Sequence, residues 1–244
     1  SMALRAFDAF AERPSIAVPT EALVSDADLP RLTPRTILAD SAKAVLTEVG
    51  GFLWLKYSDL GRIVRSVASG LASRLVPGSC VAIAGYNDFE WLCADLAATI
   101  AGMCVVGIHT TYDVHTAVSC VNSLEIPALI CLSDLVCRSS RKQPEPSQLD
   151  DGSRWSASAL CAQCQSLKLV VGSDLTVDQL RESLTEEVSH ARLAEIALGS
   201  MVDWAAGLDD APAVDLPDPF WARGAKYGAL DGSDARAMFP VLFT

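Results

Sequence analysis

The most constraining feature of this sequence is a regular alternation of short apolar runs with segments of helical period. Apolar runs of strand length occupy residues 52–55, 80–84, 104–108, 128–132 and 167–171, and apolar side chains recur at three- and four-residue steps between most of them. Such alternation is typical of right-handed βαβ units that form a parallel sheet. Because the runs are apolar throughout, we expect helices to cover both faces of that sheet.

Capping residues and helix-breaking residues mark where the helices begin and end. A helix is predicted from Tyr57 to about Leu75 and ends at Pro77-Gly78. Asp88 and Asp113 are predicted to cap the next two helices, a fourth spans residues 157–164, and Thr176 begins a helical pattern that runs to about residue 198. The predicted fold class is therefore α/β, a three-layer, mostly parallel sheet flanked by helices.

The remaining segments suggest a division of the 244 residues. Residues 1–2 are interpreted as a remnant of a purification tag, and residues 3–50 as an irregular lead-in that four prolines interrupt. Residues 51–244 are predicted to form the α/β unit, with an exposed polar insertion at about residues 139–156.

Composition excludes some classes of function. The net charge is −11 and basic residues do not cluster, so the sequence is a poor candidate for nucleic-acid binding. Apolar stretches are too short for a transmembrane segment, and no secretory signal pattern is present. We therefore expect a cytoplasmic protein, with membrane association of a longer parent protein left open.

Eight cysteines need an explanation in such a chain. Most lie in or beside apolar runs, so we interpret them as small buried hydrophobic residues in a reducing compartment. Cys161 and Cys164 form a lone C-x-x-C pair, which is weak evidence for a metal or redox site. The eight are Cys80, Cys93, Cys104, Cys120, Cys131, Cys137, Cys161 and Cys164.

Catalytic signatures are scarce, and no G-x-S-x-G, H-E-x-x-H, G-x-G-x-x-G or P-loop motif occurs. Polar segments that follow the predicted strands are better candidates, because open parallel sheets bind ligands at the carboxyl ends of their strands. These segments are residues 85–87, 109–112 and 133–134. The alternative is ordinary turn chemistry, with Asn87 and Asp113 as helix caps and His109 as a polar loop residue.

Four segments in order resemble the N-terminal part of the adenylate-forming enzymes, which include acyl-CoA synthetases, luciferases and the adenylation domains of peptide synthetases. Residues 54–60 (WLKYSDL) are similar to the first core motif of that family, and residues 70–83 (GLASRLVPGSCVAI) to the helix and strand that follow it. Residues 87–91 (NDFEW) and 101–112 (AGMCVVGIHTTY) resemble the next two motifs. The last one is most like fatty acyl-CoA synthetases, although Val106-Gly107 stands where the family usually has a proline. The resemblance covers residues 50–135 well and is weaker up to residue 244.

The resemblance implies ATP, Mg²⁺ and CoA as cofactors of a parent enzyme that activates a fatty acid or another carboxylic acid. Residues 239–244 resemble the strand that leads into the phosphate loop, so Thr244 would begin that loop and the fragment would be truncated before it. Arg138 and Arg141 have the spacing of two arginines that contact CoA in acetate-type members, and Thr110 and Thr111 lie on the same side. No catalytic residue is assigned, and the fragment alone is expected to bind no cofactor and to be inactive.

Three functions remain open at this stage. The first is the N-terminal fragment of an acyl-CoA synthetase, an acid–thiol ligase. The second is a non-enzymatic, flavodoxin-like module that binds a small ligand or a protein. The third is another adenylate-forming branch, such as a luciferase-like or amino-acid-activating enzyme. The residues that follow Thr244 in the parent gene would separate the first two.

Overall fold

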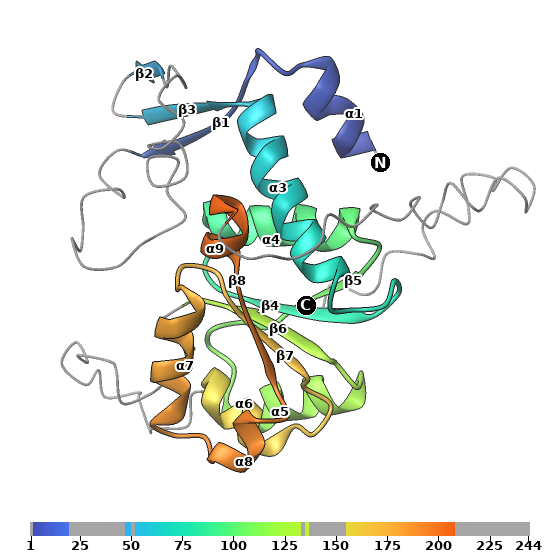
Figure 1. Ribbon diagram of the computed structural model, residues 1–244, viewed down its shortest axis with the longest axis vertical. Helices are drawn as coiled ribbons and strands as arrows, with labels where there is room; N and C mark the ends of the chain where they lie inside the picture. Colours follow the sequence, from blue (N-terminus) through green and yellow to red (C-terminus); the bar gives the residue numbers. More distant parts are fainter. Residues whose placement is uncertain (1, 20–46, 50–51, 133–134, 137–154, 208–244) are drawn as a thin grey trace, which may run out of the picture.

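A five-stranded parallel sheet forms the centre of the computed structural model, which describes residues 2–19, 47–49, 52–132, 135–136 and 155–207 (Figure 1). The order of its strands is β5-β4-β6-β7-β8, and every neighbouring pair is parallel. The predicted parallel sheet is thus confirmed. The strands are β4 (Cys80–Ala84), β5 (Cys104–Gly107), β6 (Ala128–Cys131), β7 (Leu169–Gly172) and β8 (Ala197–Ser200).

The direction of the chain across the sheet reverses once. From β4 the chain moves outward to β5 and then returns past β4 to β6, after which β7 and β8 follow in sequence. Because parallel crossovers are right-handed, this reversal puts helices α4 (Phe89–Ile100) and α5 (Val114–Ser123) on opposite faces. Helices therefore cover both faces, which explains why the strands are apolar throughout.

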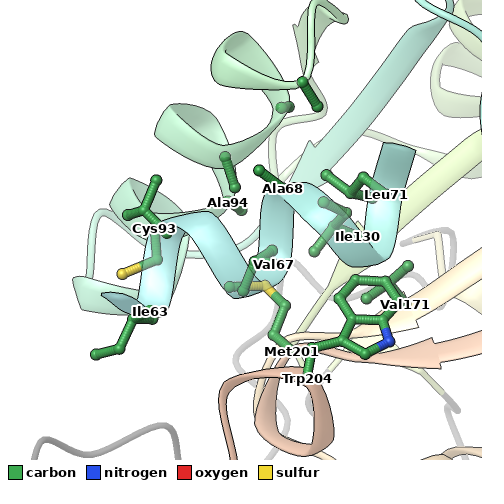
Figure 2. Close-up of a cluster of buried hydrophobic side chains, with 14 of the residues drawn as sticks. Ile63, Val67, Ala68, Leu71, Cys93, Ala94, Ile130, Val171, Met201 and Trp204 are labelled. Carbon is green, nitrogen blue, oxygen red and sulfur yellow. The ribbon is translucent and has the colours of Figure 1, made fainter. Parts of the chain in front are cut away.

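One face is covered by a core that we call the α3–α4 core. Helix α3 (Tyr57–Ala72) and α4 pack side by side, and α9 (Met201–Ala206) completes this layer (Figure 1). Figure 2 shows their side chains meeting residues of β6 and β7 that point to this face. The labelled members are Ile63, Val67, Ala68, Leu71, Cys93, Ala94, Ile130, Val171, Met201 and Trp204.

A glycine allows α9 to approach α3 closely. A Cβ atom on Gly70 would lie 2.3 Å from Cδ2 of Trp204, a separation that no packed side chain tolerates. Trp204 is buried, and the Arg74 guanidinium lies over its ring, 5.1 Å from the centroid. The indole of Trp204 thus fills the space that the missing side chain leaves.

The second face is covered by the α5–α6 core. Helices α5, α6 (Ala157–Gln163), α7 (Val177–Thr185) and α8 (His190–Leu193) lie on this side of the sheet (Figure 1). Alternate residues of one strand serve the two cores, since Val81 and Ile83 belong to the α3–α4 core while Ala82 and Ala84 belong to the α5–α6 core. This alternation is the geometric signature of a strand buried on both sides.

A smaller antiparallel sheet precedes the parallel one. Its strand order is β1-β3-β2, with β1 (Pro14–Pro19), β2 (Thr47–Val49) and β3 (Phe52–Lys56), and helix α1 (Met2–Ala9) packs against α3. Two sequence predictions are therefore wrong. The apolar run at 52–55 is a strand, but it pairs in this separate sheet and not in the parallel one. Regular elements also occur within residues 3–50, where we expected an irregular segment. Prolines 14 and 19 stand at the ends of β1, where β-structure accepts them.

The helix predicted from Thr176 to about residue 198 is also incorrect in its second half. Thr176 does begin a helix, through a capping box with Gln179, but α7 ends at Thr185. Helix α8 and strand β8 follow, and β8 pairs with β7 as an edge strand. The predicted caps Asp88 and Asp113 are confirmed, because their side chains accept hydrogen bonds from the backbone N–H groups of Trp91 and Thr116.

The insertion predicted at about 139–156 lies outside the described ranges up to residue 154. Trp155 and Ser156, at its end, are each only 1% exposed, so the prediction of an exposed segment is wrong for these two residues. None of the helices within the described residues combines the length and apolar character that a membrane span needs.

The contact between Gly70 and Trp204 leads to a prediction about stability. Gly70→Ala should lower the free energy of unfolding by about 1–3 kcal/mol, because the added methyl group must displace a buried indole. The gain of about 1 kcal/mol in helix propensity offsets only part of the steric cost. Urea denaturation followed by circular dichroism measures the difference.

Gly107→Ala is the matched control, since a Cβ atom there would meet no atom within 4 Å. Its stability should stay within about 0.5 kcal/mol of the unsubstituted protein. A Gly70→Ala variant as stable as this control would contradict the packing argument.

Candidate functional site

The candidate site is the carboxyl edge of the parallel sheet, where the chain reverses direction. Beyond the strand ends, Ile108 N–H donates to the Ile83 carbonyl at 2.9 Å and Leu132 N–H donates to the Ala84 carbonyl at 3.4 Å. The loops after β4, β5 and β6 therefore start side by side. Open α/β sheets bind ligands at such a switch point, which here lies between β4 and β6.

The loop after β4 comes close to the loop after β6. A Cβ atom on Gly85 would lie 3.0 Å from Cδ1 of Leu132, so glycine is the residue that fits this approach without displacement. Tyr86 follows and is 56% exposed, and Asn87 is exposed as well. Asp88 rather than Asn87 caps α4, with the Trp91 N–H at 2.9 Å from its carboxylate, so the interpretation of Asn87 as a cap is wrong.

The loop after β5 folds the His109 imidazole back onto its own turn. His109 Nδ1 accepts from the Thr111 N–H at 3.2 Å and lies 2.7 Å from the Thr111 hydroxyl. Since Nδ1 accepts a hydrogen bond from a backbone N–H, the neutral ring carries its own hydrogen on Nε2. His109 is exposed to solvent. The ring also lies 5.9 Å from that of Tyr112, centroid to centroid.

A distant residue holds this turn in place. Trp155 is almost fully buried, and its indole N–H donates to the His109 carbonyl at 3.0 Å. The bond joins two positions 46 residues apart and fixes the start of the β5 loop against α6. Nothing local in the sequence links Trp155 to that loop, so this contact could not be predicted from the sequence.

Asp113 ends the β5 loop in a structural role. Its carboxylate accepts from the Thr116 N–H at 2.7 Å, and this bond lowers the pKa of Asp113. Thr110 and Thr111 precede it at the predicted edge, where Thr110 is half-buried and Thr111 is exposed. The edge thus offers hydroxyl, amide and imidazole groups to a polar ligand. Within the described residues, no hydrogen bond joins His109 to a carboxylate that would make it a general base.

Two polar residues after β7 were not singled out from the sequence. Ser173 and Asp174 are each only 4% exposed, and both the backbone N–H and the hydroxyl of Ser173 bond to the Cys131 carbonyl, at 2.9 and 3.2 Å. A signal was present, because the tripeptide Ser-Asp-Leu at 173–175 repeats the one at 133–135 after the neighbouring strand. The first two residues of that earlier copy lie outside the described ranges.

The C-x-x-C pair is structural. Cys161 and Cys164 are fully buried at the end of α6, where the Arg192 guanidinium donates to their carbonyls at 2.8 Å each and to the Leu167 carbonyl at 2.9 Å. The guanidinium also contacts Glu195 at 2.9 Å. Arg192 therefore supplies donors to carbonyls at and just beyond the end of this helix, where intrahelical donors run out, and the Cys164 carbonyl also accepts from the Leu167 N–H at 3.3 Å. Burial raises the pKa of the Cys164 thiol to about 11, although the nearby guanidinium acts in the opposite direction.

The remaining predicted site residues cannot be placed at this edge. Arg138, Arg141, Ser133, Asp134 and Thr244 all lie outside the described ranges. The residues described contain no group of three His, Cys, Asp or Glu side chains able to hold a metal ion. What the described edge can do chemically is bind and orient a polar ligand.

Comparison with known proteins gives a family match and a set of similar folds. The sequence profile of one family, described as AMP-binding enzyme, matches residues 37–214. No curated protein sequence matches this chain.

Among solved structures, the adenylation domain of a carboxylate reductase from Mycobacterium chelonae has a TM-score of 0.58 at 16% identity, over 89% of this chain and 30% of that one. The A-PCP didomain of a carboxylic acid reductase from Segniliparus rugosus, in complex with AMP, has a TM-score of 0.56 at 17% identity, over 88% and 27%. The A domain of carboxylic acid reductase from the same organism, with AMP and a co-purified carboxylic acid, has a TM-score of 0.55 at 16% identity, over 88% and 31%. The chain thus spans less than a third of these structures, and the similarity shows the fold.

The Arg192 contacts predict a large loss of stability on substitution. Arg192→Met should lower the free energy of unfolding by about 3 kcal/mol, because it removes a buried guanidinium that donates hydrogen bonds to three carbonyls. Arg62→Met is the control, since Arg62 is exposed on α3. Chemical denaturation measures both, and equal midpoints for the two variants would contradict the assigned role.

The Cys164 thiol predicts a loss of stability at alkaline pH. Its pKa is raised from the usual 9.0 to about 11, so the folded chain keeps this proton over a range in which the unfolded chain loses it. The contribution is complete below pH 9 and declines as the pH rises from 9 to 11. The urea midpoint of the unsubstituted protein should therefore fall more steeply over this range than that of Cys164→Ala. Parallel pH profiles would rule the effect out.

Proposed function

The chain belongs to the AMP-binding enzyme family, and from this premise we propose that it is part of an enzyme that activates a carboxylic acid as an acyl-adenylate. The observation that carries this proposal is the family match over residues 37–214, which includes all five strands of the parallel sheet. The α/β fold of the chain matches the N-terminal part of an adenylation domain.

The proposed reaction has two steps. A carboxylate oxygen attacks the α-phosphorus of ATP, which forms the acyl-adenylate and releases pyrophosphate. A thiol sulfur then attacks the acyl carbon, so that a thioester forms and AMP leaves. We propose CoA as the thiol and a fatty acid as the carboxylate, on the similarity of residues 101–112 to fatty acyl-CoA synthetases. One solved structure of similar fold contains AMP and a co-purified carboxylic acid, which supports the first step for that protein.

We propose that the described part of the chain contributes a scaffold and one side of a ligand site. The hydroxyls of Thr110 and Thr111 stand at the carboxyl edge of the sheet and suit the polar groups of CoA. Arg138 and Arg141 are proposed to bind its phosphates, because a guanidinium forms paired hydrogen bonds with phosphate oxygens. Thr244 is proposed to begin the loop that holds the phosphates of ATP.

Binding of Mg²⁺ is not assigned to the described residues. They offer no group of three ligating side chains for a metal ion, and so no step is derived through one. The residues that act on ATP and on its metal are proposed to lie in further sequence, in line with the fraction of the related structures that this chain spans.

Assays on the product of the complete parent gene test this function. We expect fatty-acid-dependent exchange of labelled pyrophosphate into ATP, and acyl-CoA on addition of CoA. The 244-residue chain alone should give neither. Exchange that depends on amino acids would point to a different adenylating branch, and acyl transfer to a carrier-protein thiol but not to CoA would refute the proposed thiol.

Variants then test the proposed CoA contacts. Arg138→Gln combined with Arg141→Gln should raise the KM for CoA about tenfold, because two charge-assisted hydrogen bonds are lost, while pyrophosphate exchange stays unchanged. Thr110→Val should act in the same direction and more weakly. The control is Arg62→Gln on the exposed side of α3. An unchanged KM in the double variant would remove the two arginines from the site.

A second candidate function rests on the order of the strands. The order β5-β4-β6-β7-β8 is that of flavodoxin-like domains, which bind small ligands at the same switch point. A self-contained binding module would show a stop codon directly after Thr244 and no carboxylate-dependent exchange. That pair of results would favour this function over the enzyme.

A further inference from the structure

Two cysteines face each other at the amino ends of neighbouring strands. Cys80 and Cys104 are the first residues of β4 and β5, and the parallel register pairs them directly. Backbone bonds fix this register, since Gly78 N–H donates to the Gly102 carbonyl at 2.7 Å and Cys104 N–H donates to the Ser79 carbonyl at 2.9 Å. The pairing is therefore a property of the backbone and not of one side-chain conformation.

The two side chains lie on the same face of the sheet. Cys80 packs against the α5–α6 core, and so does Val106, which is two residues beyond Cys104 on the same strand. Because side chains of a strand alternate between faces, Cys104 points the same way as Val106 and therefore as Cys80. Cys104 is exposed and Cys80 is half-buried, so reagents in solution can reach the pair.

The backbone spacing suits a cross-link. Neighbouring strands lie about 4.8 Å apart, and the Cα atoms of disulfide-bonded cysteines are usually about 4.4–6.8 Å apart. Among the strands that the structure describes, β5 is at the edge of the sheet and pairs with β4 alone. It can therefore make the small movement that brings two sulfur atoms to bonding distance.

The pKa of the Cys80 thiol depends on its burial and on the neighbouring Cys104. Burial raises the pKa of the Cys80 thiol, and the negative charge of a neighbouring Cys104 thiolate raises it further. Cys104 is also the more accessible of the two. In a reaction with an external disulfide, Cys104 is thus the first nucleophile and Cys80 the second.

We propose that Cys80 and Cys104 form a vicinal dithiol that low-molecular-weight disulfides convert reversibly into an intrachain disulfide. The Cys104 sulfur attacks the external disulfide, forms a mixed disulfide and releases one thiol. The Cys80 sulfur then attacks the Cys104 sulfur, forms the Cys80–Cys104 bond and releases the second thiol. The external disulfide is the oxidant, it gains two electrons, and the two cysteine protons end on the released thiols.

The other described cysteines do not share this arrangement. Cys93, Cys131, Cys161 and Cys164 are buried in the cores, and Cys120 lies half-buried on α5 outside any strand register. The dithiol also lies at the amino ends of the strands, opposite the carboxyl edge described above. The cross-link would close a loop that contains α4, so it acts on stability rather than on the ligand edge.

Mass spectrometry of the 244-residue chain tests the proposal. The protein is incubated with oxidised glutathione, free thiols are blocked with N-ethylmaleimide, and chymotryptic peptides are analysed. Cleavage with cyanogen bromide after Met103 provides a second readout, because it separates the two cysteines into fragments that only a disulfide holds together. We expect a pair of peptides linked by a Cys80–Cys104 disulfide, which dithiothreitol reduces. We also expect the midpoint of thermal unfolding of the oxidised protein to rise by several degrees.

Single variants separate the two steps. Cys80→Ser should retain glutathione on Cys104, because the second nucleophile is missing. Cys104→Ser should block both the adduct and the cross-link, and Cys120→Ser, the matched control, should form the cross-link normally. Glutathione that stays on Cys104 of the unsubstituted protein, or Cys104–Cys104 dimers in place of the intrachain bond, would overturn the proposal.

Discussion

The fold depends above all on strand β4, which is paired on both edges and buried on both faces. Its parallel pairing with β5 and β6 fixes the register of these three strands. Its alternate residues supply the α3–α4 core and the α5–α6 core, so both helical layers pack against it. The reversal of chain direction also occurs at β4, which is why the candidate site lies at its carboxyl end.

Hydrogen bonds from polar groups at the helix ends join elements that are distant in the sequence. Arg192 satisfies three carbonyls at and beyond the end of α6, and the Asp203 carboxylate accepts from the Val177 N–H at 2.9 Å, which joins the starts of α9 and α7. These contacts link elements that are far apart in sequence. The Trp155 bond to the β5 loop is of the same kind, because a buried side chain donates to the backbone of a distant, exposed turn. The Trp155 bond thus holds the start of the β5 loop at the carboxyl edge of the sheet.

The two ends of the sheet have different chemistry. At the carboxyl ends, exposed tyrosine, asparagine and threonine side chains face solvent beside a histidine whose Nδ1 is used within its turn. At the amino ends, Cys80 and Cys104 stand in register on neighbouring strands, and they are the groups for which we propose thiol chemistry. Because the candidate site and the thiol pair lie at opposite ends of the strands, each can be tested without disturbing the other.

Local patterns in the sequence determined much of this structure. Continuous apolar runs set the strands at 80–84 and 128–131, and the side chains of Asp88, Asp113 and Thr176 set the helix starts, because both signals act within a few residues. Ordered motifs over residues 50–135 also indicated the adenylate-forming family. The position of the loops after β4 and β5 at one edge followed from the parallel sheet.

Only the tertiary structure decided which strands pair. Residues 52–55 form a strand in either arrangement, and their place in the antiparallel sheet depends on β1, which lies more than thirty residues earlier in the chain. Strand β8 begins where the predicted helix was to end. Its residues form a strand because pairing with β7 outweighs their local preference for helix. The close approach of Gly70 to Trp204 and the register of Cys80 with Cys104 likewise arise from long-range packing. The sequence by itself determined the elements and the family, while the pairing of strands and the contacts between layers required the folded chain, since no local signal encodes a distant neighbour.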